Sequence, residues 1–376
     1  MEISILGSTG SIGSQTLDVI RNLNQNGYKI KVKALSANKN ISLLQKQIDE
    51  FNPELICVCD EIFADELQKN LTDIEILKGQ DGLIRIAHEK VSILVNAIVG
   101  FNGLQPTLES IYAKNNVALA NKESLVIAGQ LIMSMAAKNN IKIIPIDSEH
   151  SAIFQALQGN DANEIDKIYL TASGGPFHKY ENFDNVTVSQ TIAHPTWNMG
   201  PKISVDSATM INKGFEIIEA FWLFNVPLKN IKVLIHPQSL IHSMVQYKDG
   251  SIIAQLGPSD MRLPIQYALT FPSRVENNFE RLDFEKSNIL TFDVPNKNLI
   301  GMDLCRETLE IGGTMPAALC IANDFAVERF LRHEYSFTDI YKFIKYVMRA
   351  HQPIFDYGLE EIFALHDWIQ NLSYEV

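Results

Sequence analysis

The sequence predicts an α/β protein with an N-terminal doubly wound, Rossmann-like domain, a central α+β domain and a C-terminal helical bundle. Three observations lead to this prediction. Short β-branched runs alternate with longer amphipathic segments up to Ile146, the pair Asp249-Gly250 separates two apolar runs, and helical periodicity prevails after Gly301. The 376 residues, of which 46% are hydrophobic, are sufficient for more than one buried core.

The N-terminal domain, expected to span residues 1–147, consists of strands that alternate with helices. The amphipathic segments between the strands supply the crossovers that a parallel sheet requires. The expected strands are residues 3–6, 30–35, 55–59, 93–97, 117–120 and 141–146. The expected helices include residues 15–23, 41–51, 104–114 and 125–138.

The pattern changes in the second half of the chain. The central domain, residues 148–273, is expected to have a strand at 167–171, a helix from about 207 to 224, and strands at 233–236, 244–247 and 252–256. Asp249-Gly250 is a strong hairpin signal, so this sheet is at least partly antiparallel. Residues 274–301 are polar and weakly periodic, as in a connecting arm. A small helical domain, residues 302–376, is expected to contain helices at 302–311, 316–331, 337–349 and 359–372.

The charge and the apolar runs limit the possible partners. A net charge of −12 argues against nucleic acid, because phosphate backbones are bound through lysine and arginine. The longest apolar runs, such as residues 91–99, are too short to span a bilayer, and Met1 leads into a strand without a basic region or cleavage site. We therefore expect no membrane partner and a cytoplasmic protein. The cysteines lack metal-ligand spacing, and we expect reduced packing residues at Cys57, Cys59, Cys305 and Cys320.

A glycine-rich turn directly follows the first expected strand. It reads Gly7-Ser8-Thr9-Gly10-Ser11-Ile12-Gly13, and a helix is expected to begin at once. Glycines in such a turn let a pyrophosphate approach the amide groups at the helix N-terminus, where the helix dipole favours negative charge. The spacing alone is a modest signal. Its place between a first strand and a first helix favours a dinucleotide site over a tight turn without a ligand.

The residues after the second expected strand indicate which dinucleotide binds. Sites that prefer NAD carry an acidic residue there, which bonds the ribose 2′-hydroxyl. Here the segment Asn38-Lys39-Asn40 contains no carboxylate. A 2′-phosphate suits Lys39, with Asn38 and Asn40 as neutral donors, so NADPH is favoured over NADH. The alternative is that Lys39 is an ordinary solvated loop lysine.

Two carboxylates follow the last expected strand of the first domain, at the end of a sheet where α/β proteins bind ligands. Asp147 and Glu149 are two residues apart, so in an extended segment they project to the same face. A cation would relieve their mutual repulsion, and oxygen ligands suit Mg²⁺ or Mn²⁺ better than zinc. The alternative is a solvated turn or a helix cap.

The expected helix at 207–224 contains candidates for a third ligand and can be capped by Asp206 or Ser207. Its apolar stripe consists of Ile211, Phe215, Ile218 and Trp222. A polar stripe consists of Asn212, Glu216 and Glu219, and such a stripe is usually the solvated face of a helix. Gly214 in mid-helix is costly unless something approaches the backbone closely, and Lys213 offers a cation for a phosphate.

Two further segments have the composition of ligand-binding loops. Ser173-Gly174-Gly175-Pro176-Phe177 ends a strand with a hydroxyl and paired glycines. Residues 193–201 contain His194 and Trp197 in an irregular stretch, and we expect a mobile lid in which Trp197 covers a substrate. Taken singly, a loop tryptophan more often packs on its own domain, and a loop histidine more often faces water.

Several long motifs, taken together, resemble those of one family. They are the turn 7–13, Ala120-Asn121-Lys122-Glu123-Ser124-Leu125, Asp147-Ser148-Glu149-His150, residues 173–177, His194-Pro195-Thr196-Trp197-Asn198-Met199-Gly200, the run 202–219 and Gly312-Gly313-Thr314-Met315-Pro316-Ala317. Over nearly the whole chain they resemble the 1-deoxy-D-xylulose 5-phosphate reductoisomerases. The resemblance implies a homodimeric enzyme of the non-mevalonate isoprenoid route that is sensitive to the phosphonate fosmidomycin.

The resemblance also implies a reaction and the residues that serve it. Deoxyxylulose phosphate is rearranged to a branched aldehyde, which NADPH reduces to 2-C-methyl-D-erythritol 4-phosphate with the help of Mg²⁺, Mn²⁺ or Co²⁺. The residues implied to contact NADPH are Thr9, Gly10, Ser11, Ile12, Asn38, Lys39, Asn40, Asn121, Glu123 and Gly200. The implied metal ligands are Asp147, Glu149 and Glu216. The residues implied to contact substrate are Lys122, Ser148, Glu149, Ser173, His194, Trp197, Ser207, Asn212, Lys213 and Glu216, and those implied to be catalytic are Lys122, Asp147, Glu149, His194 and Glu216.

The chain departs from the family pattern at two places. Asn38 stands where many relatives have a smaller residue, and Cys320-Ile321 interrupts an Asn-Ala-Ala-Asn-like stretch of the last domain. One competing interpretation is a two-domain NADP dehydrogenase of the aspartate-semialdehyde type, but the cysteine nucleophile that it needs is missing between Asp147 and Gly301. Another is a non-catalytic NADPH-sensing protein, which would need neither the metal carboxylates nor a lid.

Overall fold

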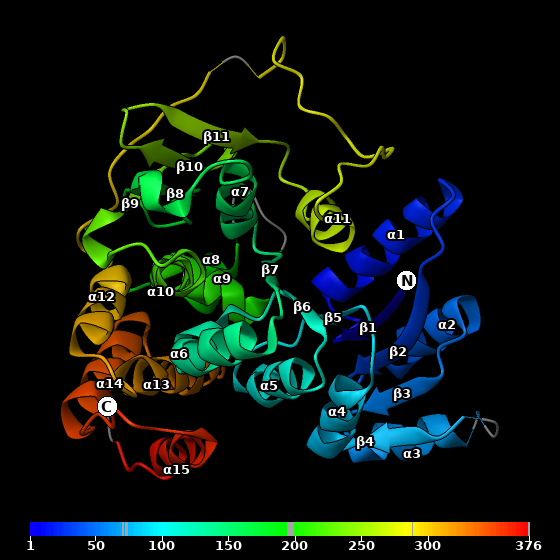
Figure 1. Ribbon diagram of the computed structural model, residues 1–376. Helices are drawn as coiled ribbons and strands as arrows, with labels where there is room; N and C mark the ends of the chain where they lie inside the picture. Colours follow the sequence, from blue (N-terminus) through cyan, green and yellow to red (C-terminus); the bar gives the residue numbers. More distant parts are fainter. Residues whose placement is uncertain (70, 72–73, 194–198, 288, 375–376) are drawn as a thin grey trace. The chain divides into compact units, whose positions relative to one another are not determined.

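The structure is a computed structural model of the chain, and it describes residues 1–69, 71, 74–193, 199–287 and 289–374. The chain divides into two compact units, whose elements are labelled in Figure 1. Unit 1 comprises Met1–Ser124, Gln130–Ser151 and Asp260–Glu280. Unit 2 comprises Leu125–Gly129, Ala152–Ser259 and Arg281–Val376.

Unit 1 is built on a seven-stranded sheet of order β4-β3-β2-β1-β5-β6-β7, in which all neighbouring strands are parallel. The strands are β1 (Glu2–Leu6), β2 (Lys31–Ala37), β3 (Leu55–Val58), β4 (Ile76–Lys78), β5 (Ile93–Asn96), β6 (Asn116–Leu119) and β7 (Ile143–Pro145). Consecutive residues of β1 and β5 are buried, as in a sheet covered on both faces. The chain runs outward from β1 to β4 and then returns to the other side of β1, so the topological switch point lies between β1 and β5.

The connections between these strands are helical. They contain α1 (Ser11–Gln25), α2 (Ile41–Phe51), α3 (Glu61–Gln68), α4 (Gly79–His88), the 3-10 helix η1 (Phe101–Gly103), α5 (Leu104–Tyr112) and α6 (Lys122–Asn139). Helix α7 (Ser148–Ala156) follows β7, and α11 (Arg262–Thr270) joins unit 1 from later in the chain. Asn22 of α1 donates to Asn278 at 2.8 Å, which fixes the segment after α11 to the first helix.

Unit 2 contains a four-stranded mixed sheet of order β11-β10-β8-β9. Its strands are β8 (Ile165–Ala172), β9 (Ile231–Ile235), β10 (Ile241–Tyr247) and β11 (Ile252–Leu256). The strands β8 and β9 are parallel, whereas β10 is antiparallel to β8 and to β11. Helix α10 (Ile211–Phe224) packs on this sheet, since Ile217 and Ala220 share one buried cluster with Ile168 and Val245.

The remaining helices of unit 2 are α8 (Val188–Ile192), α9 (Pro201–Ala208), α12 (Gly301–Ile311), α13 (Met315–Leu331), α14 (Phe337–Ala350) and α15 (Leu359–Gln370), with the 3-10 helices η2 (Ala162–Glu164) and η3 (Leu228–Asn230). Helices α12 to α15 confirm the expected helical C-terminal region. Buried aromatic rings join α13 to α14, including an edge-to-face pair of Phe330 and Phe337 at 6.1 Å between ring centroids. Within the described ranges, no helix is both long and apolar enough to cross a bilayer.

The predicted fold class is confirmed, but two regions differ from the expected elements. The sequence predicts no element between residues 60 and 92, where the structure has α3, β4 and α4. Because β4 is an edge strand of 3 residues, it is too short for a periodic signal. The expected helix at 207–224 is two helices, since Met210 between α9 and α10 has a left-handed φ of 59°. The helix also begins earlier than expected, at Pro201.

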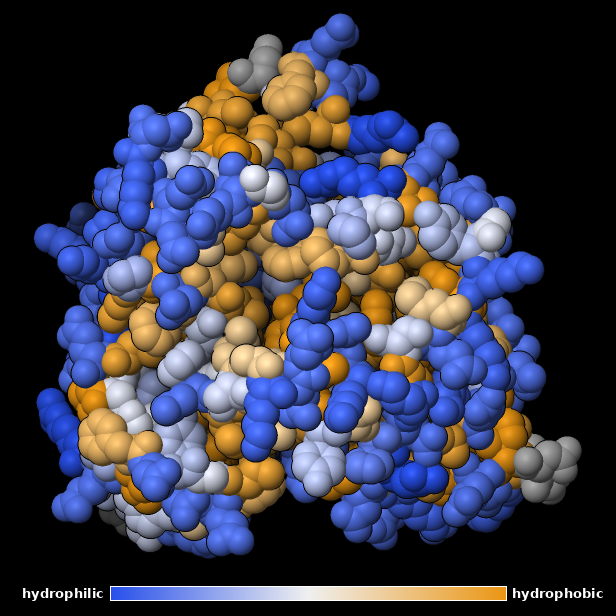
Figure 2. Space-filling view, in the orientation of Figure 1, coloured by the Kyte–Doolittle hydropathy of each residue, from blue (hydrophilic) through white to orange (hydrophobic). Residues whose placement is uncertain are grey.

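Several of the exposed apolar side chains of unit 2 lie in two segments. Ile252 and Ile253 lie on β11, at one edge of the mixed sheet, and Phe284, Ile289 and Val294 precede α12. Val294 is 74% exposed. Figure 2 shows apolar residues in the upper part of the view, where Figure 1 draws β11. Exposed apolar groups in such numbers are typical of surfaces that contact another protein.

Candidate active site

The carboxyl ends of the parallel strands form one edge of the unit 1 sheet, which we name the cofactor edge. Candidate site residues follow four of these strands: the turn 7–13 after β1, residues 38–40 after β2, residues 121–123 after β6 and Asp147 after β7. Open parallel sheets bind ligands outside this edge, beside the topological switch point. The sheet topology thus gathers segments that are far apart in the sequence.

The glycine-rich turn has a geometry that a larger residue would disrupt. Gly7 has a φ of 80°, and a Cβ there would lie 2.7 Å from the carbonyl oxygen of Ala97. A Cβ on Gly13 would lie 2.2 Å from the carbonyl oxygen of Gly7 and 2.5 Å from Ser8 Cα. Gly10 is the N-cap of α1 and makes no side-chain cap hydrogen bond. A bound anion would therefore take the place of a cap at the first amide groups of α1.

A buried hydrogen-bond network holds this turn against β2 and α2. Ser8 Oγ donates to Gln47 Oε1 at 2.7 Å, and Gln47 Nε2 donates to the Ser8 carbonyl oxygen at 2.9 Å. Ser36 Oγ accepts from the amide of Gly7 at 2.9 Å. Because Ser8 and Ser36 are buried, these bonds do not compete with water. The implied NADPH contacts at this turn, Thr9, Gly10, Ser11 and Ile12, lie half-buried or exposed at the start of α1.

The three polar residues after β2 are exposed, and the side chains of two of them have local partners. Asn40 caps α2, since its Oδ1 accepts from the amide of Leu43 at 3.2 Å. Lys39 Nζ lies 3.6 Å from Asp60 Oδ2, and the Asp60 amide donates to the Asn38 carbonyl oxygen at 3.3 Å. Sequence reasoning missed Asp60, although its place at the end of the strand after β2 was the available signal.

Asn121 joins the start of α6 to the loop after β5. Its Oδ1 accepts from the amide of Ser124 at 3.1 Å, so it caps α6. Its Nδ2 donates to the carbonyl oxygens of Ile98 and Gly100 at 2.7 and 2.9 Å. The same amide lies 3.2 Å from Glu123 Oε2, and both side chains are buried. Asn121 therefore shapes the cofactor edge itself, a role that the sequence did not indicate.

A lysine and a buried histidine flank the carboxylate that follows β7. Lys122 Nζ lies 2.6 Å from Asp147 Oδ2, and His150 Nδ1 lies 3.5 Å from the same oxygen. Burial opposes ionisation of Asp147, but the charge of Lys122 and the neighbouring imidazole of His150 outweigh it, so the pKa of Asp147 lies well below its usual range. Asp147 is thus an anion at neutral pH. Sequence reasoning gave His150 no role, although it stands in the motif that begins at Asp147.

Glu149 lies in the first turn of α7, which corrects the extended segment assumed from the sequence. The amide of Ser151 donates to the Asp147 carbonyl oxygen at 2.8 Å, so the helix begins directly after Asp147. A carboxylate oxygen of Asp147 and one of Glu149 nevertheless lie within 4.8 Å of each other. Ser148 Oγ donates to Glu149 Oε2 at 2.6 Å. A helical turn, not strand alternation, brings the carboxylates together at a separation that fits a shared divalent cation.

In unit 2, the candidate charged residues lie in the first turns of α10. Lys213 forms an ion pair with Glu216, and its Nζ donates to the carbonyl oxygen of Thr171 on β8 at 2.5 Å. Asn212 Nδ2 donates to Glu216 Oε1 at 2.6 Å. Glu216 and Glu219 are each 1% exposed. The polar stripe of α10 is therefore not the solvated helix face that such a stripe usually forms.

The loop after β8 approaches α9 closely. Ser173 Oγ accepts from the amide of Gly175 at 3.4 Å. Gly175 has a φ of 65°, and a Cβ there would lie 3.1 Å from the carbonyl oxygen of Ser207. The paired glycines thus let the Ser173 loop lie against the backbone of Ser207, and the structure brings these two hydroxyl residues into one part of unit 2.

One expectation about the helix at 207–224 needs correction, and two other expectations are confirmed. Asp206 and Ser207 lie inside α9 and cap neither helix, because the N-cap of α10 is Met210. The close approach that Gly214 indicated is confirmed, since a Cβ there would lie 2.4 Å from Cys305 Sγ on α12. Cys305 is a buried free thiol, as expected for a packing residue.

The candidate residues are divided between the two units. Unit 1 contains Thr9, Gly10, Ser11, Ile12, Asn38, Lys39, Asn40, Asn121, Lys122, Glu123, Asp147, Ser148 and Glu149. Unit 2 contains Ser173, Gly200, Ser207, Asn212, Lys213 and Glu216, with Gly200 as the N-cap of α9. The proposed lid residues His194 and Trp197 lie outside the described residues.

Known proteins resemble the chain over nearly its full length. The family model described as 1-deoxy-D-xylulose 5-phosphate reductoisomerase matches residues 3–129, and models of C-terminal domains of this enzyme match residues 143–224 and 256–372. A 1-deoxy-D-xylulose 5-phosphate reductoisomerase of Ruminiclostridium cellulolyticum is 51% identical over 377 residues, which is 99% of this chain and 98% of the relative. The chain belongs to the 1-deoxy-D-xylulose 5-phosphate reductoisomerase family.

Other reductoisomerases of the family agree in sequence and in fold. That of Acetivibrio thermocellus is 53% identical over 380 residues, covering 100% of this chain and 98% of the relative. The Zymomonas mobilis enzyme in complex with NADPH superposes with a TM-score of 0.90 at 39% identity, covering 98% of this chain and 97% of that one. A DOX-P reductoisomerase in complex with NADPH, fosmidomycin and magnesium gives 0.91 at 39% identity, with coverages of 98% and 96%.

Proposed function

We propose that this reductoisomerase family member converts 1-deoxy-D-xylulose 5-phosphate to 2-C-methyl-D-erythritol 4-phosphate, using NADPH and a divalent cation, in the non-mevalonate isoprenoid route. One observation carries the proposal. A glycine-rich turn suited to a dinucleotide and a carboxylate pair suited to a cation lie along the same cofactor edge. A family structure in complex with NADPH, fosmidomycin and magnesium supports both ligands.

The proposed metal ligands are Asp147 and Glu149 of unit 1 and Glu216 of unit 2. When bound, NADPH supplies the hydride, and the cation supplies Lewis-acid stabilisation of negative charge that develops on substrate oxygens. Carboxylates suit Mg²⁺, Mn²⁺ or Co²⁺, and the separation of at most 4.8 Å between oxygens of Asp147 and Glu149 supports a shared ion. Hydrogen bonds from Asn212 and Lys213 orient the carboxylate of Glu216.

Lys122 is proposed to stabilise the charge of Asp147 and to bind the substrate. Its ammonium group keeps Asp147 ionised, because the ion pair of 2.6 Å outweighs the cost of burial. An ammonium group at this place also suits a substrate oxygen that becomes negative during carbon-carbon cleavage. Ser148 donates to Glu149 and so orients a ligand, and it is proposed to contact the substrate as well.

The phosphate of the substrate is proposed to lie against unit 2. Its proposed contacts are Ser173, Ser207, Asn212 and Lys213. The close approach of the Ser173 loop to Ser207 supports this set, as does the cation of Lys213, which the carbonyl oxygen of Thr171 holds in place. His194 and Trp197 are proposed to contact the substrate and to cover it, on the strength of the sequence resemblance.

The proposed cofactor contacts follow the cofactor edge. The start of α1 suits the pyrophosphate, and Lys39 with its neighbours suits the 2′-phosphate that distinguishes NADPH from NADH. The proposed set is Thr9, Gly10, Ser11, Ile12, Asn38, Lys39, Asn40, Asn121, Glu123 and Gly200. Of these residues, Asn40 and Asn121 also cap helices, so their side chains are oriented before any ligand binds.

We also propose that two copies of the chain form a homodimer in the cytoplasm, as the family resemblance implies. The exposed apolar side chains of β11 and of residues 284–294 provide surface for such contact. Light scattering of the purified protein would give twice the mass of one chain. A single-chain mass at micromolar concentration would contradict the homodimer.

The reaction is tested by following NADPH oxidation with 1-deoxy-D-xylulose 5-phosphate, with and without EDTA. We expect NADPH consumption only when substrate and divalent cation are both present, recovery after Mg²⁺ is added back, and 2-C-methyl-D-erythritol 4-phosphate as the product by mass spectrometry. Tight binding of NADPH without any consumption would favour a non-catalytic sensor instead. Unchanged rates in EDTA would contradict the metal ligands.

A further inference from the structure

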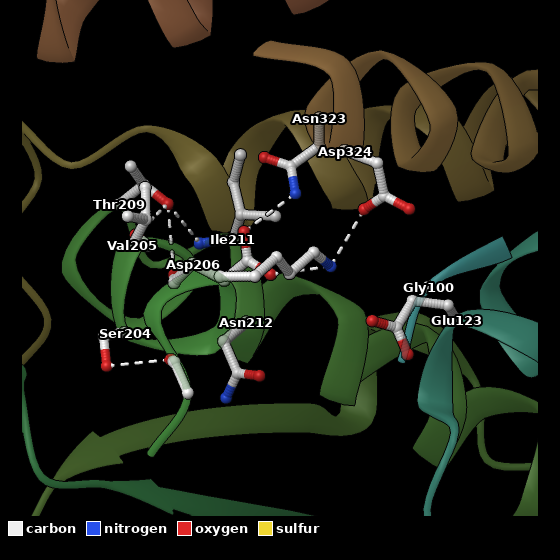
Figure 3. Close-up of polar contacts among 12 residues, drawn as sticks. Gly100, Glu123, Ser204, Val205, Asp206, Thr209, Ile211, Asn212, Asn323 and Asp324 are labelled. Carbon is white, nitrogen blue, oxygen red and sulfur yellow. Dashed lines mark hydrogen bonds and ion pairs between the residues drawn. The ribbon is translucent and has the colours of Figure 1, made fainter. Parts of the chain in front are cut away.

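A network of charged and polar side chains ties α9 to α13 within unit 2. Lys202 Nζ lies 2.9 Å from Asp206 Oδ2, one turn along α9, and 2.9 Å from Asp324 Oδ1 on α13. Asn323 Nδ2, also on α13, donates to Asp206 Oδ1 at 2.8 Å. Figure 3 shows the contacts that Asp206, Asn323 and Asp324 make across the two helices. We name Lys202, Asp206, Asn323 and Asp324 the α9–α13 network.

Because the α9–α13 network is largely buried, its charged side chains require specific partners. The side chain of Asp206 is 3% exposed, that of Lys202 is 19% exposed, and Asn323 is fully buried. A buried carboxylate needs both an opposite charge and hydrogen bonds to offset the loss of water. Lys202 supplies the charge and Asn323 supplies a hydrogen bond, so the position of Asp206 depends on both helices.

The α9–α13 network contacts the immediate sequence neighbours of two candidate site residues. Asp206 precedes Ser207, a proposed phosphate contact. Lys202 Nζ lies 5.4 Å from the ring centroid of Phe215, which precedes the proposed metal ligand Glu216. A displacement of Lys202 therefore acts on the backbone at both ends of the segment 206–216, which we name the α9–α10 corner.

A second set of hydrogen bonds closes this corner. Thr209 Oγ1 lies 3.0 and 3.1 Å from the carbonyl oxygens of Val205 and Asp206, and it accepts from the amide of Ile211 at 3.4 Å. Tyr341 of α14 donates from its hydroxyl to the Thr209 carbonyl oxygen at 2.9 Å. The left-handed Met210 at the bend of the corner is thus held from the C-terminal helices, through Thr209 and through Asp206.

We propose that the α9–α13 network positions the substrate's phosphate, with Lys202 and Asp324 as positioning residues that act through Ser207 and the start of α10. The inference rests on the proposed function, because Ser207, Asn212 and Lys213 are proposed phosphate contacts. The phosphate does not react, so its misplacement weakens substrate binding more than turnover. No residue of the α9–α13 network is a proposed NADPH contact, and the proposed NADPH contacts other than Gly200 belong to unit 1, so NADPH binding should stay unchanged.

Steady-state kinetics of Asp324→Asn test the inference. We expect a KM for 1-deoxy-D-xylulose 5-phosphate that is about 10-fold higher, a kcat within about 3-fold of wild type, and an unchanged KM for NADPH. Lys202→Met should raise the same KM further, and Lys202→Arg should restore most of the loss because it keeps the cation. The matched control is Glu328→Gln on the same helix, which breaks an exposed ion pair with Arg332 and should leave every constant unchanged.

The outcomes separate the inference from the proposed function. If the wild type consumes NADPH with the substrate but folded Asp324→Asn keeps its KM, or if both KM values rise together, the network does not position the phosphate. If the wild type shows no turnover in the same assay, the proposed function fails and the inference falls with it. Should Lys202→Met not fold, Asp324→Asn decides, because the Asp324 side chain is already 27% exposed.

Discussion

The cofactor edge of unit 1 and the α9–α10 corner of unit 2 position polar groups by different means. At the edge, residues follow the ends of parallel strands, and backbone pairing aligns those ends. At the corner, a left-handed Met210 separates α9 from α10, and side chains from α13 and α14 hold this segment. Backbone pairing therefore positions the polar groups of the cofactor edge, whereas individual charged and hydroxyl side chains position those of the α9–α10 corner. Substitutions in the two regions should therefore affect different properties of the enzyme.

The largest effect is expected at the corner, for Glu216→Gln. Loss of a proposed metal ligand should lower kcat at saturating Mg²⁺ by about 1000-fold or more, because stabilisation of developing charge is lost. The Kd for NADPH should stay within about 2-fold, since Glu216 is not among the proposed NADPH contacts. Rapid-quench turnover and a fluorescence titration with NADPH measure the two quantities.

The control for Glu216→Gln is Glu307→Gln, an exposed acidic residue on α12, which should leave both quantities unchanged. Near-normal turnover of Glu216→Gln at saturating Mg²⁺ would remove Glu216 from the metal ligands. An equal loss of NADPH affinity would show that the two regions are not independent.

The second effect is expected at the edge, for Gly13→Ala. The new Cβ would meet the backbone of Gly7 and Ser8, which cannot move aside as a flexible side chain does. We expect the free energy of unfolding to fall by about 2–3 kcal/mol and NADPH binding to weaken, because α1 is pushed away from the turn. Denaturant unfolding and an NADPH titration measure these changes.

Gly27→Ala, just beyond the other end of α1, is the control for Gly13→Ala. Gly27 has a φ of 90° but open space around it, so only backbone strain of about 1 kcal/mol is expected, with NADPH affinity unchanged. Equal stability losses in the two variants would mean that close packing at Gly13 is not what the turn requires.

The smallest effect is expected for Lys39→Ala, also at the edge. Lys39 is 64% exposed, so water and salt screen its charge, and we expect the KM for NADPH to rise only about 5- to 10-fold. The KM for NADH should not change, since NADH lacks the 2′-phosphate. The ratio of kcat/KM values for NADPH and NADH, measured at low and high salt, checks this. Equal losses for both cofactors would exclude the proposed 2′-phosphate contact.

The parts of the fold that sequence predicted are those with a local, repeated signal. Alternating strands and helices predicted the doubly wound unit, and Asp249-Gly250 predicted the β10–β11 turn, where the amide of Gly250 donates to the Tyr247 carbonyl oxygen at 2.9 Å. The bend at Met210 had no such signal, because methionine rarely adopts a left-handed conformation and tertiary contacts must impose it. Gly214 in mid-helix did indicate a close approach, but its neighbour Cys305 on α12 comes from later in the chain, so no local signal identified it.

The amino-acid sequence by itself determined the chemistry of this protein: a glycine turn at the first strand, a lysine in place of an acid after the second, and carboxylates after the last. These are types of residue at particular strand ends. A parallel sheet brings its strand ends to one edge whatever the packing of the individual side chains. Only the tertiary structure decided which side chains from distant parts of the chain contact each other. Asn323 on α13 and Asp206 on α9 are 117 residues apart. Such pairs depend on how helices pack, which no spacing along the chain encodes.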